Sequence, residues 1–303
     1  MQKETTMGIL VAVISVLALA VIFLCGTARM AVRPKVHTLQ YELDTLMKID
    51  YMKNERIDWE NEHKVKSFDG YELWTAFVPG NLENKNYVIL SHGYTSTRYG
   101  MYKYVALWRR LGYNCVIYDN RGHGVNEPDT VSFGWRECKD LMAVIEDTYN
   151  RYGNDIHIGL HGESMGSGLQ LMSLALKPKV DFIVNDCGYS EILPVIRWKA
   201  NSALNLPDWL PNLASPVAKL LFGFSFEEVR PIDNLKENEI PICFVHGIED
   251  TFTHKWHSEK MYEVNKGYKE LHLFEGADHA ECVVSDEKRY QKMLEDFVAK
   301  VYS

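Results

Sequence analysis

The segment at 162–166, Gly-Glu-Ser-Met-Gly, carries the strongest chemical signal in the chain. It follows an apolar run typical of a buried strand at 155–160 and opens a helical pattern that ends at Pro178. In a G-x-S-x-G pattern between a strand and a helix, the serine stands on a sharp turn, and the glycines leave room for the strand and the helix to approach. The hydroxyl also lies at a helix N-terminus, where backbone N–H groups favour a developing negative charge. We therefore predict that Ser164 is a nucleophile that attacks a carbonyl carbon.

A serine nucleophile at neutral pH requires a nearby base, and the base requires an acid that orients it. In sites built on a strand–turn–helix of this kind, the acid and then the histidine follow the serine along the chain. Asp250 follows the apolar run at 241–245, and His279 follows the run at 270–274. We predict His279 as the base and Asp250 as the acid, with Glu249 as the alternative acid.

Acyl transfer through a serine also needs N–H donors for the oxyanion of its tetrahedral intermediate. Gly93 and Tyr94 come shortly after the strand pattern at 87–90, and Met165 directly follows the serine. The sequence predicts that the backbone N–H groups of Tyr94 and Met165 form the oxyanion hole. Gly93 is expected to let the chain bend close to the nucleophile.

Short apolar runs and helical patterns alternate through most of the chain, and these are the elements that must position the site. Asp69-Gly70 between two β-rich runs predicts a hairpin at the start of the globular domain, near His63. The alternation that follows predicts βαβ units, hence a mostly parallel central sheet with helices on both faces. Buried strands are expected at 87–90, 114–118, 155–160, 181–185, 241–245 and 270–274, and helices at 100–111, 141–152 and 290–298.

The connection from Asp186 to Ile240 is much longer than the dozen or so residues that a crossover needs. It is rich in Trp, Phe and Leu and is interrupted by prolines. We predict that 186–240 forms a lid insertion of short helices over the carboxyl edge of the sheet, with its apolar side chains buried. The alternative is a surface insertion that only packs on the core.

The amino-terminal segment has the composition of a membrane helix. No charged residue occurs in 7–26, and about 20 helical residues span the roughly 30 Å hydrocarbon core of a bilayer. We predict a retained transmembrane anchor at 1–26 (span 7–26) that contributes nothing to the fold, followed by a linker and polar helix at 27–62 and a catalytic domain at 63–303. A cleaved secretory signal is the alternative.

The orientation of the anchor is indicated by the charges beside it. Arg29, Arg33 and Lys35 follow the span, so the positive-inside rule favours a cytoplasmic catalytic domain. The six cysteines show no spacing typical of a disulfide framework, which favours the same side.

Composition excludes some classes of function. The net charge of −8 and the lack of a basic run argue against a nucleic-acid partner, because neutralising phosphates takes clustered Lys and Arg. His254 and His257 could share one helix face, but no third ligand accompanies them, so we predict neither a metal nor an organic cofactor. The sequence does not indicate an oligomeric state.

Together these motifs resemble the alpha/beta-hydrolase superfamily over residues 63 to 302. The resemblance rests on the motifs quoted above and on His92-Gly93, the segment Tyr-Asp-Asn-Arg-Gly-His-Gly at 118–124 and Gly-Ala-Asp-His at 276–279. Within the superfamily the chain is similar to membrane-anchored bacterial members grouped with the serine aminopeptidase, monoacylglycerol lipase and protein-depalmitoylase-like branches. It departs from the usual pattern at Val125-Asn126, in a turn that we expect to border the substrate pocket.

The resemblance and the proposed triad imply hydrolysis of an ester or thioester through an acyl-enzyme. The apolar lid and the anchor favour a small-molecule or lipid-like substrate with a hydrophobic acyl group. A serine peptidase or aminopeptidase is the alternative, and a catalytically silent binding protein on the same scaffold is a third hypothesis.

Overall fold

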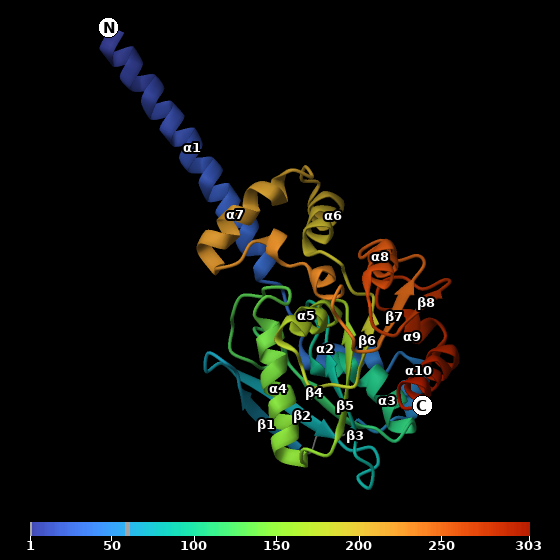
Figure 1. Ribbon diagram of the computed structural model, residues 1–303. Coiled ribbons are helices and arrows are strands. Elements are labelled where there is room, and N and C mark those ends of the chain that lie inside the picture. Colours follow the sequence, from blue (N-terminus) through green and yellow to red (C-terminus); the bar gives the residue numbers. More distant parts are fainter. Residues whose placement is uncertain (1, 58–60) are drawn as a thin grey trace.

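The computed structural model of the protein describes residues 2–57 and 61–303. Within these residues, eight strands form one sheet in the order β1-β2-β4-β3-β5-β6-β7-β8 (Figure 1). The β1–β2 and β2–β4 pairs are antiparallel, and every later pair is parallel, as predicted. The strands are β1 (Asn61–Lys66), β2 (Glu72–Val78), β3 (Asn86–Ser91), β4 (Asn114–Tyr118), β5 (His157–Glu163), β6 (Phe182–Asp186), β7 (Ile242–Gly247) and β8 (Lys269–Phe274).

Helices cover both faces of this sheet and create two apolar cores. Along β3, Val88 and Leu90 belong to one core, whereas Tyr87 and Ile89 belong to the other, since successive side chains of a strand point to opposite faces. Burial on both faces explains why the central strands are near-continuous apolar runs. The first core lies against α3 (Tyr102–Arg110) and α10 (Glu287–Val301), and the second against α4 (Glu137–Tyr152), α5 (Met165–Ser173) and α8 (Trp256–Val264).

The connection between β6 and β7 contains two helices, α6 (Ile192–Leu204) and α7 (Leu210–Phe222). Both lie beyond one edge of the sheet, with α7 beside the amino-terminal helix and α6 beside α7 (Figure 1). Two short 3₁₀ helices, η4 (Phe226–Glu228) and η5 (Pro231–Asn234), return the chain to β7. We call residues 186–240 the lid segment.

The prediction that the apolar side chains of the lid segment are buried is wrong for part of α7. Leu210 and Ala214 are buried, but Trp209, Leu213 and Leu220 are 59%, 50% and 84% exposed. The cause is geometric, because α7 contacts the protein on one face only. The outer face keeps an apolar stripe at helical spacing.

The amino-terminal helix α1 (Gln2–Val32) is longer than predicted, so the expectation of a linker from residue 27 onward is wrong. Thr27 to Val32 continue the helix, which ends just before Arg33 and Pro34, because the residue preceding a proline is disfavoured in helical geometry. After it come α2 (Leu39–Leu46) and the 3₁₀ helix η1 (Asp50–Asn54).

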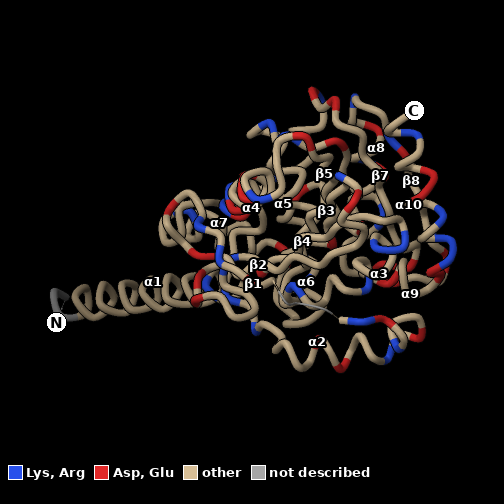
Figure 2. Tube along the Cα trace, turned by 90° about the horizontal axis from the view of Figure 1, so that it is seen from below, with Lys and Arg blue, Asp and Glu red and all other residues tan. Residues whose placement is uncertain are grey.

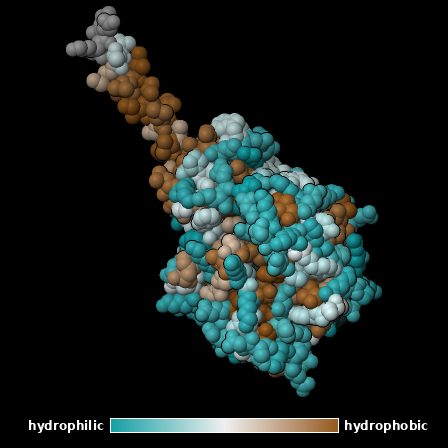
Figure 3. Space-filling model, viewed as in Figure 1, coloured by the Kyte–Doolittle hydropathy of each residue, from teal (hydrophilic) through white to brown (hydrophobic). Residues whose placement is uncertain are grey.

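The α1 helix has two parts. From Thr5 to Phe23 its side chains are exposed, apolar for most of that length and free of charge (Figures 2 and 3), whereas Ala28 and Val32 are fully buried against the domain. The stretch Thr5–Val32 is long and apolar enough to cross a membrane, a test that a signal sequence also passes.

Candidate active site

Ser164 lies on a strained turn between β5 and α5. Its backbone angles, φ +53° and ψ −111°, lie in a region that residues with a side chain rarely adopt. A Cβ atom added at Gly162 would lie 2.5 Å from the Gly166 carbonyl carbon, and one added at Gly166 would lie 1.9 Å from the Ser91 carbonyl oxygen. Glycine is therefore required on both sides of the serine, which is the reason the motif predicted such a turn.

The three residues predicted as a triad lie together at the carboxyl ends of their strands. Ser164 Oγ is 2.9 Å from His279 Nε2, and His279 Nδ1 is 2.7 Å from Asp250 Oδ2. Ser164 follows β5, Asp250 follows β7, and His279 follows β8. With a proton on Nδ1, the ring donates to Asp250, and its Nε2 accepts the hydrogen bond of the serine hydroxyl.

Asp250 is buried and surrounded by donors. Its Oδ1 accepts hydrogen bonds from the backbone N–H groups of Phe252 (2.9 Å) and Thr253 (2.7 Å), and its Oδ2 lies 3.2 Å from His246 Nε2. Burial alone would raise the pKa of this carboxyl, but the hydrogen bonds from His246 and His279 outweigh it and hold the pKa well below its usual value. Asp250 is thus a permanent anion beside the imidazole.

The alternative acid, Glu249, points elsewhere. Its Oε2 accepts the backbone N–H of Gly276 at 2.8 Å, at the start of the turn that leads to His279. Its side chain therefore braces this turn, while Asp250 is the carboxylate that reaches the imidazole.

Tyr94 and Met165 border Ser164 from two different elements. Met165 is the first residue of α5, and Tyr94 follows Gly93 in the loop after β3. A Cβ atom added at Gly93 would lie 3.5 Å from the Ser164 Cβ atom, so this loop passes directly against the nucleophile. Both residues line the same pocket as Ser164.

His92 holds this loop in place, a contact that the sequence did not indicate. Its ring is fully buried, and Nε2 accepts the backbone N–H of Asn120 at 2.9 Å. The Asn120 side chain in turn donates to the His92 carbonyl at 3.0 Å. The pKa of His92 lies well below its usual value, mainly because the ring is buried and secondly because His123 is near, so the ring stays neutral.

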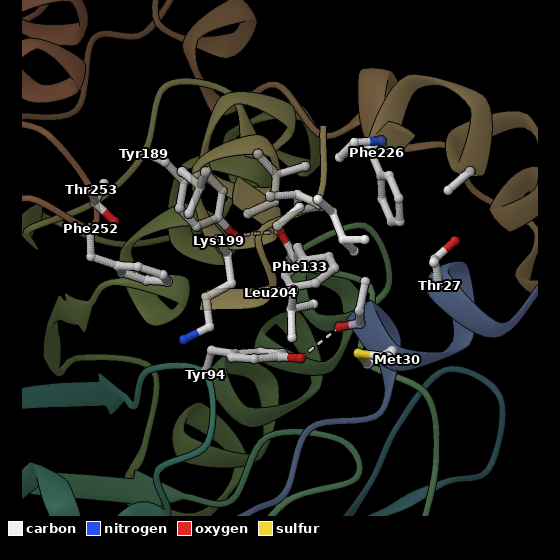
Figure 4. A pocket seen from close by; sticks show the side chains of 18 of the residues that line it. Thr27, Met30, Tyr94, Phe133, Tyr189, Lys199, Leu204, Phe226, Phe252 and Thr253 are labelled. Carbon is white, nitrogen blue, oxygen red and sulfur yellow. Dashed lines mark hydrogen bonds between the residues drawn. The ribbon is translucent and has the colours of Figure 1, made fainter. Parts of the chain in front are cut away.

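An apolar pocket of about 230 Å³ opens at Ser164 (Figure 4). Its walls come from the lid segment, from the Tyr94 loop and from the end of α1. Among the described residues that line it, Lys199 is the one charged side chain. The lining includes Thr27, Met30, Ala31, Tyr94, Phe133, Tyr189, Ile192, Ile196, Leu204, Leu210, Ala214 and Phe226.

A second and larger cavity, of about 990 Å³, also reaches Ser164 and His279. Its lining is much more polar and comes largely from α2 and the loops around it, including His37, Tyr41, Glu42, Lys103, Glu163 and Glu281. The nucleophile therefore borders one apolar space and one larger space with a mixed polar and apolar lining. Such a division suits a substrate with an apolar acyl part and a polar leaving group.

A buried polar network lies behind the nucleophile. Lys103 Nζ is 2.5 Å from Glu163 Oε2 and donates to the carbonyl of Ala280 at 3.0 Å, so it connects the residue before Ser164 with the residue after His279. The Tyr104 hydroxyl lies within hydrogen-bond distance of both Glu163 (2.8 Å) and Asp186 (3.0 Å). Sequence reasoning missed these residues because their spacing in α3 is that of ordinary core positions.

The expectation that Val125-Asn126 borders the substrate pocket is wrong. Neither residue is among the described residues that line the two cavities at Ser164. Asn126 instead accepts from the Trp74 N–H (2.8 Å) and donates to the Asp119 carbonyl (2.8 Å), so it joins the 118–124 segment to β2. The departure from the family pattern at Val125-Asn126 therefore affects how this loop is held and not the lining of the pocket.

His257 has a structural environment. Its Nδ1 accepts the backbone N–H of Ser190 (3.1 Å) and lies 2.8 Å from the Ser190 hydroxyl, and its ring stacks on Trp256. His254 Nδ1 lies 3.1 Å from the backbone carbonyl of Asp250, close to the triad.

We predict that the protein loses stability in mild acid, because folding lowers the pKa values of two buried histidines, His161 and His257. The pKa of His161 is lowered to about 3, mainly by burial and secondly by the charge of Lys103. The pKa of His257 is also lowered to about 3, mainly by burial and secondly by His246. In the unfolded chain both protonate near pH 6.5. A pKa lowered by folding contributes stability that is complete above the unfolded pKa and is lost as the pH falls toward the folded pKa. Between pH 7 and pH 5 the two rings together account for a loss of about 4 kcal/mol.

Asp186 acts in the opposite direction, because burial raises its pKa to about 6 and its protonation favours the folded state as the pH falls. It offsets about 1 kcal/mol of the loss between pH 6.5 and pH 5.

The measurement is the free energy of unfolding by urea at pH 7, 6 and 5, for the wild type and His257→Gln. We expect the wild type to lose at least about 3 kcal/mol, because folding also lowers the pKa values of the buried His92 and His123, and we expect a shallower dependence in the variant. Equal stability at pH 7 and pH 5 would contradict this account.

Comparison with known proteins places this geometry among enzymes. Residues 83–220 match the family described as serine aminopeptidase, S33. The chain is 30% identical over 237 residues to the uncharacterized protein YqkD of Bacillus subtilis (strain 168), covering 77% of each. It is 24% identical over 292 residues to the monoglyceride lipase of Saccharomyces cerevisiae, covering 78% of this chain and 91% of that protein.

The fold is shared with solved structures. The Pyrococcus furiosus esterase Pf2001 superposes with a TM-score of 0.66 at 20% identity, over 80% of this chain and 92% of that chain. At this level of identity the likeness establishes the arrangement of strands and helices. It agrees with the mostly parallel sheet described above.

Proposed function

We propose that this chain, which belongs to the alpha/beta-hydrolase superfamily, hydrolyses esters or thioesters of a hydrophobic acyl group through Ser164, His279 and Asp250. The family match and the similarity to a lipase and an esterase support a carboxylic ester hydrolase. The observation that carries the finer proposal is the apolar pocket that opens at Ser164, beside the chain of hydrogen bonds from Ser164 to Asp250.

The geometry allows each chemical step. His279 Nε2 accepts the proton of Ser164 as Oγ attacks the carbonyl carbon, and Asp250 stabilises the imidazolium that forms. The backbone N–H groups of Tyr94 and Met165 stabilise the oxyanion. His279 then returns the proton to the leaving group, and a water molecule, activated by the same base, releases the acyl group from Ser164.

An aminopeptidase is the alternative, since the matching family carries that description. A free α-amino group in the acyl pocket would meet the cation of Lys199, and the described lining offers it no carboxylate there. The pocket therefore favours an uncharged acyl chain over an amino-acid residue with a free amine.

We further propose that α1 is a retained membrane anchor. The apolar stripe of Trp209, Leu213 and Leu220 on α7 supports this, because α7 packs beside α1 at the same end of the molecule (Figure 1). Tryptophan is enriched at membrane–water interfaces. Arg29, Arg33 and Lys35 at the end of the span favour a domain on the cytoplasmic side.

The test of this function is a panel of p-nitrophenyl acetate, butyrate, octanoate and laurate beside aminoacyl p-nitroanilides. Each methylene of an acyl chain that enters this apolar pocket exchanges contact with water for contact with apolar side chains. We therefore expect kcat/KM to rise from acetate to octanoate by up to about fourfold per methylene, or about 0.8 kcal/mol each. Preference for the anilides, or a flat profile, would favour the peptidase.

The lid segment is expected to set this preference. Ala214 is buried in α7 and lines the pocket, so Ala214→Leu should fill part of it and lower kcat/KM for octanoate by about tenfold, while acetate is affected about twofold or less. The matched control is Leu213→Ala, one position away on the exposed face of the same helix. If both variants keep the wild-type profile, the lid segment does not contact the acyl chain.

A further inference from the structure

The last turns of α1 are built into the domain. Ala28 and Val32 are fully buried, and the carbonyl of Val32 accepts the backbone N–H of Val131 at 2.8 Å. The carbonyl of Ala31 accepts the hydroxyl of Tyr94 at 2.6 Å. The residue whose backbone N–H is proposed for the oxyanion hole is thus bonded through its side chain to the amino-terminal helix.

The same turns form a wall of the apolar pocket. Thr27, Met30 and Ala31 line it together with Ser164. Figure 4 shows Thr27 and Met30 on the same helix, at the side of the pocket where the Tyr94 hydroxyl bonds to the Ala31 carbonyl. Because Met30 is half exposed and flexible, its thioether can adapt to the shape of a bound chain.

The exposed part of α1 continues directly from this wall. Ile22 and Phe23 are 66% and 51% exposed, and no charged residue lies between Ile22 and Ala28. An acyl chain longer than the pocket would therefore meet an uninterrupted apolar surface along the helix. The neighbouring helix α7, which supplies Leu210 and Ala214 to the pocket, packs against α1 on the other side of this path.

We propose that α1 is part of the acyl-binding site, with Met30 as the residue that limits chain length and Ala31 as the residue that positions the Tyr94 loop. The ligand is the acyl chain of a lipid or of a lipid-modified molecule, held between the lid segment and the amino-terminal helix. This inference rests on the proposed ester hydrolase function. It makes the segment that anchors the enzyme a determinant of its specificity.

The experiment uses the full-length chain in phospholipid nanodiscs with p-nitrophenyl acetate, octanoate and laurate. Met30→Trp should lower kcat/KM for octanoate and laurate by about tenfold or more relative to acetate, because the indole fills the end of the pocket. Met30→Ala should shift the optimum toward laurate. The matched control, Leu19→Trp, places the same side chain three turns earlier on the same face of α1 and should keep the wild-type profile.

Two outcomes separate this inference from the function on which it rests. A wild type that prefers octanoate, with both Met30 variants showing the same profile, overturns the role of α1 and leaves the hydrolase intact. A wild type that cleaves none of the esters and does not react with a fluorophosphonate overturns the proposed function and this inference together. A changed profile in Leu19→Trp equal to that in Met30→Trp would also count against the inference, because the effect would then not be local to the pocket.

Discussion

Replacing Ser164 with alanine is expected to abolish covalent labelling by a fluorophosphonate and to lower kcat on p-nitrophenyl octanoate by on the order of 10⁶, as found when the nucleophile of another serine hydrolase was removed. The serine is the only group at the turn that can form the acyl-enzyme in the proposed mechanism. Its Oγ lies 2.9 Å from His279 Nε2, on a backbone with positive φ that aims it into the pocket mouth. The measurement is in-gel fluorescence of the labelled protein, followed by ester kinetics.

A matched control is available in the same helix. Ser173 is also buried in α5, but its hydroxyl donates to the Gln170 carbonyl at 2.6 Å and touches neither cavity described above. Ser173→Ala should be labelled like the wild type. Labelling that persists in Ser164→Ala would falsify the assignment of the nucleophile.

Asp250→Asn is expected to lower kcat by on the order of 10⁴ with a much smaller change in KM, the size seen for the same change in another triad. An asparagine amide at this position donates where the carboxylate accepted, so the imidazole is held in the wrong tautomer. The loss should be similar across the pH range in which the enzyme is folded, because the pKa of Asp250 lies far below it.

Glu249→Gln is the control for this prediction. The glutamine carbonyl can still accept the Gly276 N–H, so activity should fall by no more than a few fold. If Glu249→Gln is crippling and Asp250→Asn is mild, the acid has been assigned to the wrong carboxylate. Circular dichroism of both variants distinguishes lost chemistry from lost folding.

The sheet and the proposed triad were accessible from the sequence because both depend on local patterns. Apolar runs of four or five residues at 87–90, 114–118 and 241–245 match β3, β4 and β7 within two residues at each end. Strands buried on both faces leave such runs, and the carboxyl ends of parallel strands meet at one edge. Residues that follow those strands, such as Asp250 and His279, are therefore brought together by topology alone.

The parts that were missed depend on contacts between segments far apart in the chain. The bond from Tyr94 to Ala31 joins residues 63 positions apart, and the contact between Tyr104 and Asp186 joins residues 82 positions apart. No spacing rule links such pairs. The apolar composition of 7–26 marked a membrane helix, but it could not show that the helix continues to Val32 and enters the site, because Thr27 to Val32 have an unremarkable mixed composition.

In the membrane-anchored state proposed above, the continuity of α1 fixes the height and orientation of the enzyme on a bilayer. With residues 7–26 in the hydrocarbon core, the helix rises at about 1.5 Å per residue, so Thr27 and Ala31 stand roughly 2 to 8 Å above it, at the level of the lipid headgroups. There is no hinge between the helix and the domain, since Ala28 and Val32 are packed in place. In this orientation the opening of the pocket lies at the membrane surface and faces a substrate that is dissolved in the bilayer. Turnover should follow the mole fraction of substrate in the membrane, and dilution with inert phospholipid should slow the enzyme even when the bulk substrate concentration is unchanged.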